Sequence, residues 1–181
     1  MLLSSREATI RSTTRGGLGG VGVREQGGVR RRVPRGNVET EGEVKARLLG
    51  AAEDAFDSFE RLVSDLPLAR RYGGWTLREL IGHLASWTAE AARGILEDMA
   101  GFPCSREARD AFNGRAREQV SRESDPELLQ RYAAARTTFL ATVMAAPPSA
   151  LAPGAVGGEW ARGVVEHYMG HIAMLEGKPA A

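Results

Sequence analysis

Three histidines are the residues of this sequence best suited to chemistry. His167 and His171 stand four residues apart, which on a helix puts both side chains on one face, about 6 Å apart along the axis. His83 is the only other histidine of the chain. Imidazole is the commonest metal ligand in proteins. We therefore predict that His83, His167 and His171 bind one divalent ion, such as Zn, Ni or Fe, and leave a fourth position open to water or substrate, as in catalytic sites.

The competing interpretation is structural. A histidine on an apolar helix face more often fills the core or its rim than binds a metal, and an HxxxH pattern arises by chance in many helices. Here every histidine belongs to an inward-facing stripe, close to Leu84 or Tyr168, and none is placed on a solvated face. Histidines that are concentrated in this way favour a site, but the pattern alone leaves both interpretations open.

Several other residues could support such a site. The candidates are Tyr168, Asn113, Glu166 and Glu90. Each has a simpler role: a core aromatic for the tyrosine, a surface or capping amide for the asparagine, and a solvated face for the two glutamates. Cys104 is the single cysteine, follows Pro103 and has no histidine nearby in sequence. We regard it as incidental, because a reactive thiol needs an activating neighbour.

Helical signals position these residues. Apolar residues recur at spacings of three and four in segments that run from the capping box Thr40-x-x-Glu43 to Pro67, and from the box Thr76-x-x-Glu79 to Gly101. A polar segment over 105–122 predicts a weaker and shorter helix. A fourth helix is predicted from Asp125, as N-cap residue before a proline, to Pro147. A loop over 147–158 follows, and the last helix runs from Trp160 to Leu175. No segment alternates as a strand does. Four amphipathic helices of this length bury their stripes by packing as an all-α bundle.

Two segments resemble each other. Residues 73–83, GGWTLRELIGH, and residues 157–167, GGEWARGVVEH, both run from glycines through tryptophan to histidine. We expect each tryptophan to pack at the mouth of the bundle with its histidine about two turns deeper. Trp75, Trp87 and Trp160 could then form the walls of an apolar pocket around the histidines.

These motifs resemble a known superfamily. GWTLRELIGHLASW resembles the second-helix signature of the DinB-like (damage-inducible) superfamily, near the branch of the mycothiol-dependent maleylpyruvate isomerase N-terminal domain; DAFNGRA and HYMGH resemble further segments of it. The resemblance covers about residues 42–176. It implies an up-down-down-up four-helix bundle with a short extra helix in the long connection, and a divalent metal on His83, His167 and His171. It also implies small-thiol transfer, isomerisation or hydrolysis. In this sequence Thr88 follows Trp87 where an acid is often found, and no second large domain follows the bundle.

The first 38 residues differ from the rest in composition. They hold eight arginines, two acidic residues and eight of the 22 glycines, a formal charge of +6, whereas the remaining residues carry −5. This stretch has no apolar periodicity, so we predict a disordered tail over 1–38 and a helical domain over 39–178. An inert extension is a simpler explanation than a nucleic-acid arm or a transit peptide, and the apolar start MLL is too short for a signal peptide.

Charge and cysteine content exclude several classes of protein. One cysteine rules out an internal disulfide framework, no apolar run reaches the ~18 residues of a membrane span, and the acidic body disfavours nucleic acid. We expect a cytoplasmic protein, either monomeric or homodimeric, that binds a small molecule or a low-molecular-weight thiol. Two functions stay open: a metal-dependent transferase or hydrolase, and a non-enzymatic stress-response or ligand-sequestering bundle.

Overall fold

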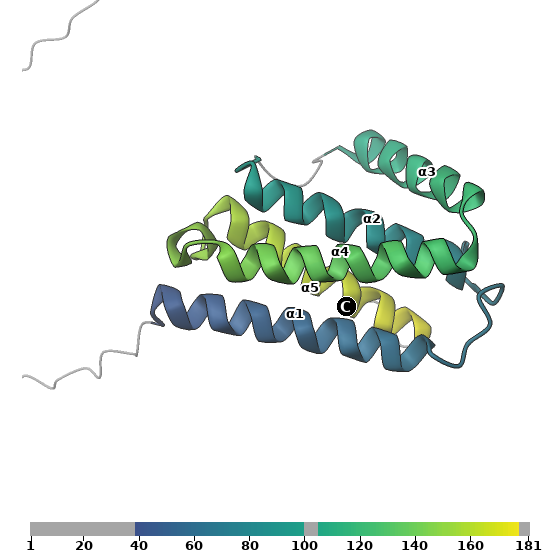
Figure 1. The fold of residues 1–181 in the computed structure, drawn as a ribbon, viewed down its shortest axis with the longest axis horizontal. Helices are drawn as coiled ribbons and strands as arrows, with labels where there is room; N and C mark the ends of the chain where they lie inside the picture. The colour runs from purple at the N-terminus through teal and green to yellow at the C-terminus, as the bar shows by residue number, and fades with distance from the viewer. Residues whose placement is uncertain (1–38, 100–104, 178–181) are drawn as a thin grey trace, which may run out of the picture. The chain divides into compact units, whose positions relative to one another are not determined.

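The computed structural model describes residues 39–99 and 105–177, and these residues are mostly helical (Figure 1). The prediction of an all-α protein is confirmed. The predictions of a disordered tail over 1–38 and of an incidental Cys104 concern residues outside the described ranges. Within them the helices are α1 (Glu41–Val63), α2 (Leu77–Leu96), α3 (Arg106–Arg122), α4 (Asp125–Ala145), η1 (Pro148–Leu151, a short 3-10 helix) and α5 (Val156–Leu175). None of them combines the length and the apolar character that crossing a membrane requires.

Capping boxes set where three of the helices begin. Thr40 pairs with Glu43 at the start of α1, and Thr76 pairs with Glu79 at the start of α2, as predicted. The start of α4 was predicted one residue too late, because Asp125 is its first helical residue and Ser124 is the N-cap. Ser124 forms a third capping box with Glu127, whose carboxylate accepts from the Ser124 backbone N–H at 2.7 Å. A serine cap places the acid in the first turn, where the helix dipole favours it.

A short hairpin with two strands of two residues each precedes α2, although no strand was predicted. Strand β1 (Arg71–Tyr72) pairs antiparallel with β2 (Trp75–Thr76), so that Tyr72 lies opposite Trp75. Gly73 occupies the turn with φ +57°, a conformation that favours glycine. The pairing is too short to produce an alternating pattern, which explains why the sequence shows only its turn.

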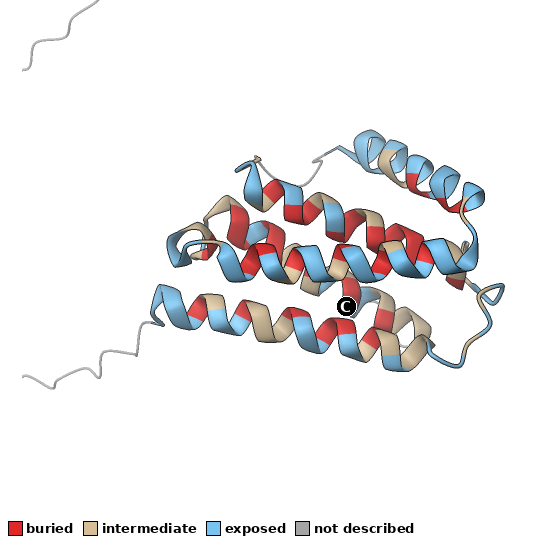
Figure 2. Cartoon of the chain, viewed as in Figure 1, coloured by how far each residue is buried: buried red, intermediate tan, exposed pale blue. Residues whose placement is uncertain are grey.

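The long helices α1, α2, α4 and α5 share one apolar core, and α3, which packs on α2, adds only Val120 to it (Figure 2). In Figure 1, α1 and α5 run from left to right, while α2 and α4 run from right to left. Helix α2 has twelve buried residues, whereas α3 buries only Ala116 and Val120. Helices α2 and α3 approach closely at Gly82, where an added Cβ would lie 2.0 Å from the Val120 side chain.

Helix α5 begins earlier than predicted. The loop over 147–158 was expected to end just before Trp160, but it contains η1, and α5 already starts at Val156. Gly157 and Gly158 are therefore helical. A Cβ at Gly158 would lie 2.6 Å from the Leu151 carbonyl oxygen and 2.7 Å from that of Ala152. These glycines serve the close approach of α5 to η1 and not, as their sequence suggested, a loop.

Arg78 joins α2 to the turn between α3 and α4. Arg78, in the first turn of α2, donates to the carbonyl oxygens of Val120 and Glu123 and pairs with the Asp125 carboxylate at 2.7 Å. Carbonyls at the end of a helix have no partner within the helix, and a cation there also complements the helix dipole. Arg78 thereby fixes the end of α3 and the start of α4 to the first turn of α2.

Candidate metal centre

The structure brings the three histidines together from two helices. His83 on α2 faces His167 and His171 on α5, with Nε2 of His83 2.8 Å from Nε2 of His167. Nε2 of His171 lies 3.0 Å from the same His167 nitrogen. One nitrogen from each ring lies within 4.8 Å of the other two. The i,i+4 spacing on α5 and one inward position on α2 are therefore enough to gather all three imidazoles.

Burial keeps these imidazoles neutral. It lowers the pKa of His83 to about 3 and that of His171 to about 4, and it holds the pKa of His167 well below the ordinary value of 6.5. A charge on either of the other two rings would lower the pKa of His167 further. At His83, the nearby Asn113 side chain acts in the opposite direction but is the weaker effect. Neutral rings keep the lone pairs that a metal ion requires.

The donor set fits a divalent transition metal. At metal–nitrogen bonds of about 2.0–2.1 Å, nitrogens at tetrahedral positions lie about 3.3 Å apart. The spacings of 2.8 and 3.0 Å would therefore widen slightly, and the His83–His171 spacing, within 4.8 Å, would adjust to the same value. Two neutral Nε2 atoms can share one proton, but three converging ones cannot all be paired this way. The Nδ1 atom of His83 is buried without a hydrogen-bond partner among the described residues. A metal cation between the three Nε2 atoms would be a common partner for all three rings. Imidazole ligands suit Zn, Ni or Fe, whereas Mg and Ca prefer oxygen.

Two of the three predicted tryptophan walls lie at the cluster. The Trp75 ring centroid is 4.8 Å from that of His83, and the Trp87 centroid is 6.5 Å from His83 and 6.2 Å from His167. The prediction was wrong for Trp160, whose indole N–H donates to the Met99 carbonyl oxygen at 3.0 Å near the other end of α2. The resemblance between residues 73–83 and 157–167 therefore does not extend to the role of the tryptophan.

The other candidate residues divide by position. The Asn113 side-chain oxygen accepts from the Trp87 indole N–H at 2.9 Å, so Asn113 helps to hold that wall. The Tyr168 hydroxyl lies 3.2 Å from Thr88 Oγ1 inside the core, which is the simpler role foreseen for it. Glu166 is exposed, and Glu90 pairs with Arg93 away from the histidines. Neither glutamate is placed at the cluster.

Sequence reasoning missed one cation beside the cluster. The Arg117 guanidinium lies 3.8 Å above the Trp75 ring, whose neighbour is His83, and it donates to the Gly74 carbonyl oxygen at 3.3 Å. Its charge also contributes to the lowered pKa of His83. No spacing rule connects residues 75 and 117, because the contact depends on how α3 packs against the hairpin. Because Arg117 lies on a weakly amphipathic helix, its sequence context predicted only a solvent-exposed side chain.

The structure is mostly helical and has a three-histidine cluster between two helices, as expected of a DinB-like domain. The family model of the mycothiol maleylpyruvate isomerase N-terminal domain, which is part of the DinB-like superfamily, matches residues 49–174. The chain belongs to this family. No curated protein and no solved structure matches it.

Proposed function

We propose that this domain binds one divalent transition-metal ion through His83, His167 and His171 and acts as an enzyme on a small molecule, by small-thiol transfer or by hydrolysis. The observation that carries the proposal is the convergence of three neutral imidazole nitrogens within 4.8 Å. Membership of the mycothiol maleylpyruvate isomerase N-terminal domain family supports the involvement of a small thiol. A bound divalent ion would lower the pKa of a coordinated water or thiol toward neutrality and polarise a substrate oxygen.

The chain's own residues would orient and shield the reacting groups. The rings of Trp75 and Trp87 lie against the histidines and would exclude water from one side of the site. Asn113 would fix the orientation of Trp87 through its hydrogen bond. Arg117, close to His83 and Trp75, would favour a substrate with negative charge near the open position.

We propose the up-down-down-up bundle order for the domain over 39–178, with α3 in the long connection. This order is supported by the opposed directions of the helices in Figure 1 and by the packing of α3 on α2. At 17 residues α3 is not a short insert, although it is the shortest of the five α-helices in the described ranges. A cytoplasmic location, a homodimer and a lack of nucleic-acid binding are further proposals, the last supported by the −5 charge of residues 39–181.

Metal analysis of the full chain, purified without a histidine tag, tests the proposal. We expect about one equivalent of a divalent ion in the unmodified protein and a large loss in His83→Ala, His167→Ala and His171→Ala. Met169→Ala is the matched control, because Met169 is exposed on the same helix as two of the ligands. Unchanged metal content in all three histidine variants would refute the site.

Cobalt substitution separates the enzyme from the alternative of a non-enzymatic, ligand-sequestering or stress-response bundle. An open position on three imidazoles accepts a thiolate, so adding a small thiol should produce a thiolate-to-cobalt charge-transfer band that is absent in His171→Ala. Turnover of an ester or amide without such a band would favour hydrolysis. If neither the band nor turnover is observed, the ligand-sequestering bundle becomes the better account.

A further inference from the structure

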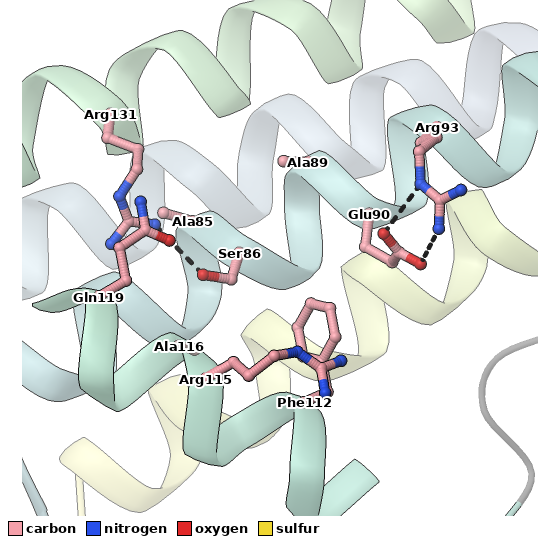
Figure 3. A pocket seen from close by; sticks show the side chains of 10 residues that line it. All are labelled: Ala85, Ser86, Ala89, Glu90, Arg93, Phe112, Arg115, Ala116, Gln119 and Arg131. Carbon is pink, nitrogen blue, oxygen red and sulfur yellow. Dashed lines mark hydrogen bonds and ion pairs between the residues drawn. The ribbon is translucent and has the colours of Figure 1, made fainter. Parts of the chain in front are cut away.

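A second cavity, separate from the histidines, opens between α2, α3 and α4 (Figure 3). Its volume is about 510 Å³, within the range of small-molecule sites. No histidine lines it. The lining combines an apolar part, formed by the Phe112 ring and the side chains of Ala85, Ala89 and Ala116, with three arginines and the Glu90 carboxylate. This combination of surfaces suits a molecule with both an apolar and a charged part.

Two of the three arginines already have carboxylate partners. Arg93 pairs with Glu90 at 2.5 Å and with Glu97 at 3.0 Å. Arg131 forms a two-bond pair with Glu123, at 2.7 and 2.9 Å. Arg93 thus has two carboxylate partners and Arg131 has one, so both guanidinium groups are paired within the protein.

Arg115 differs from the other two arginines. Across residues 39–99 and 105–177, no carboxylate lies within ion-pair distance of it, and its guanidinium lies 5.7 Å from the Phe112 ring centroid. In Figure 3 the Arg115 side chain runs past Phe112 at the edge of the cavity. The cavity thus offers one guanidinium without a carboxylate partner beside one aromatic face. A ligand carboxylate could pair with Arg115 as the protein's own carboxylates pair with Arg93 and Arg131.

Aromatic packing gives the cavity a firm wall. The Phe112 ring lies 4.3 Å from the Trp87 ring, measured between centroids. Trp87 in turn is held by Asn113 and contacts the histidines on its other side. The Trp87–Phe112 pair therefore separates the cavity from the histidine cluster, and a ligand against Phe112 would not need the metal centre.

We propose that this cavity binds a small organic monocarboxylate with a flat apolar body, whose carboxylate pairs with Arg115 and whose body packs on Phe112 and the alanine side chains. Guanidinium and carboxylate form strong charge-assisted hydrogen bonds, and aromatic faces favour offset or edge contacts with another ring. The proposal does not depend on the metal-dependent function.

Calorimetric titration of the full chain with benzoate tests it, with benzamide as the uncharged analogue of the same shape. We expect saturable binding of one benzoate in the millimolar range, and binding of benzamide weaker by about tenfold. Arg115→Gln should weaken benzoate binding by a similar factor. Arg109→Gln is the matched control, because Arg109 is exposed on the same helix and does not line the cavity; it should change the affinity less than about twofold.

Four results would overturn the proposal: no benzoate binding up to tens of millimolar, equal binding of benzamide, unchanged affinity in Arg115→Gln, or displacement of benzoate by an equal concentration of inorganic phosphate. The titration is repeated after metal removal with a chelator and in His171→Ala. Unchanged benzoate affinity there supports the cavity, whatever the metal analysis gives. Loss of binding would place benzoate at the histidines and contradict the proposal.

Discussion

Two segments with a local resemblance in sequence, residues 73–83 and 157–167, have different roles in this molecule. Around Trp75, the glycines form a hairpin turn, and the half-buried indole lies between the Arg117 guanidinium and the His83 ring. Around Trp160, the glycines are helical and the indole is 1% exposed. The first tryptophan is only half-buried and borders the candidate metal site, whereas the second fills the core.

The difference comes from what each tryptophan meets on α2. Trp160 packs where Gly94 has no side chain, since a Cβ there would lie 2.4 Å from the indole. Trp75 meets the imidazole of His83, about three turns earlier on the same helix. Local resemblance therefore reflects how each segment enters a helix and not what its aromatic residue does. The core contact of Trp160 and the candidate metal site therefore lie near opposite ends of α2.

The largest effect should come from removing the core tryptophan. Trp160→Ala empties a fully buried position and loses the bond to the Met99 carbonyl, so we expect unfolding free energy to fall by about 3–5 kcal/mol. Trp75→Ala should cost about 1 kcal/mol, because Trp75 is only half-buried, yet it should weaken metal binding. Urea denaturation and metal analysis of both variants measure the contrast. Equal stability losses would remove the distinction between the two tryptophans.

A second contrast lies in the glycines before each tryptophan. Gly158→Ala drives a Cβ against two backbone carbonyl oxygens at 2.6 and 2.7 Å, so we expect a loss of about 1–3 kcal/mol. Gly74→Ala has nothing within 4 Å of its new Cβ and should change stability by less than about 0.5 kcal/mol. Melting temperatures of the two variants provide the measurement. A tolerated Gly158→Ala would mean that α5 and η1 can separate at low cost.

The histidine end should also respond to pH in the metal-free protein. The folded pKa of His83 is about 3 and that of His171 about 4, whereas in the unfolded chain both titrate near 6.5. Between these values the unfolded state holds more protons, so stability is lost as pH falls below 6.5. From pH 7 to pH 6 we expect a loss of about 0.7 kcal/mol per histidine and at most about 2 kcal/mol for all three.

Denaturation at these two pH values, with and without His171→Gln, checks the pH effect. Carboxylates titrate below this window, so the histidines should dominate the change. The variant should lose about a third of it. A metal-free protein whose stability is the same at pH 6 and pH 7 would mean that the imidazoles are not buried in solution as they are here.

The sequence predicted the features that follow from local spacing. The boxes at Thr40 and Thr76 and the gathering of His167 with His171 depend on neighbours three or four residues away. Features set by distant parts of the chain were missed. Gly157 and Gly158 were interpreted as loop residues because the carbonyls that require them, at Ala150 and Leu151, belong to η1.

The candidate site shows the same division. His83 could be assigned to an inward stripe, but its distance to the α5 histidines depends on how two helices pack. Arg117 reaches Trp75 from α3, whose polar sequence gave no inward direction. Trp160 was assigned to the site because its local pattern resembles that of Trp75, and pattern alone does not state which end of the partner helix a side chain meets.

The contacts of Arg78 have a consequence for the order of folding. They join residues that are 42 to 47 positions apart in the chain, and closing a loop of that length costs entropy before the contacts offset it, so we expect these contacts to form late in folding. Interactions that form late slow unfolding more than they speed folding. Loss of Arg78 should therefore shorten the lifetime of the native state while leaving the refolding rate almost unchanged. The contacts of Arg78 at the corner between α3 and α4 thus slow the unfolding of the domain.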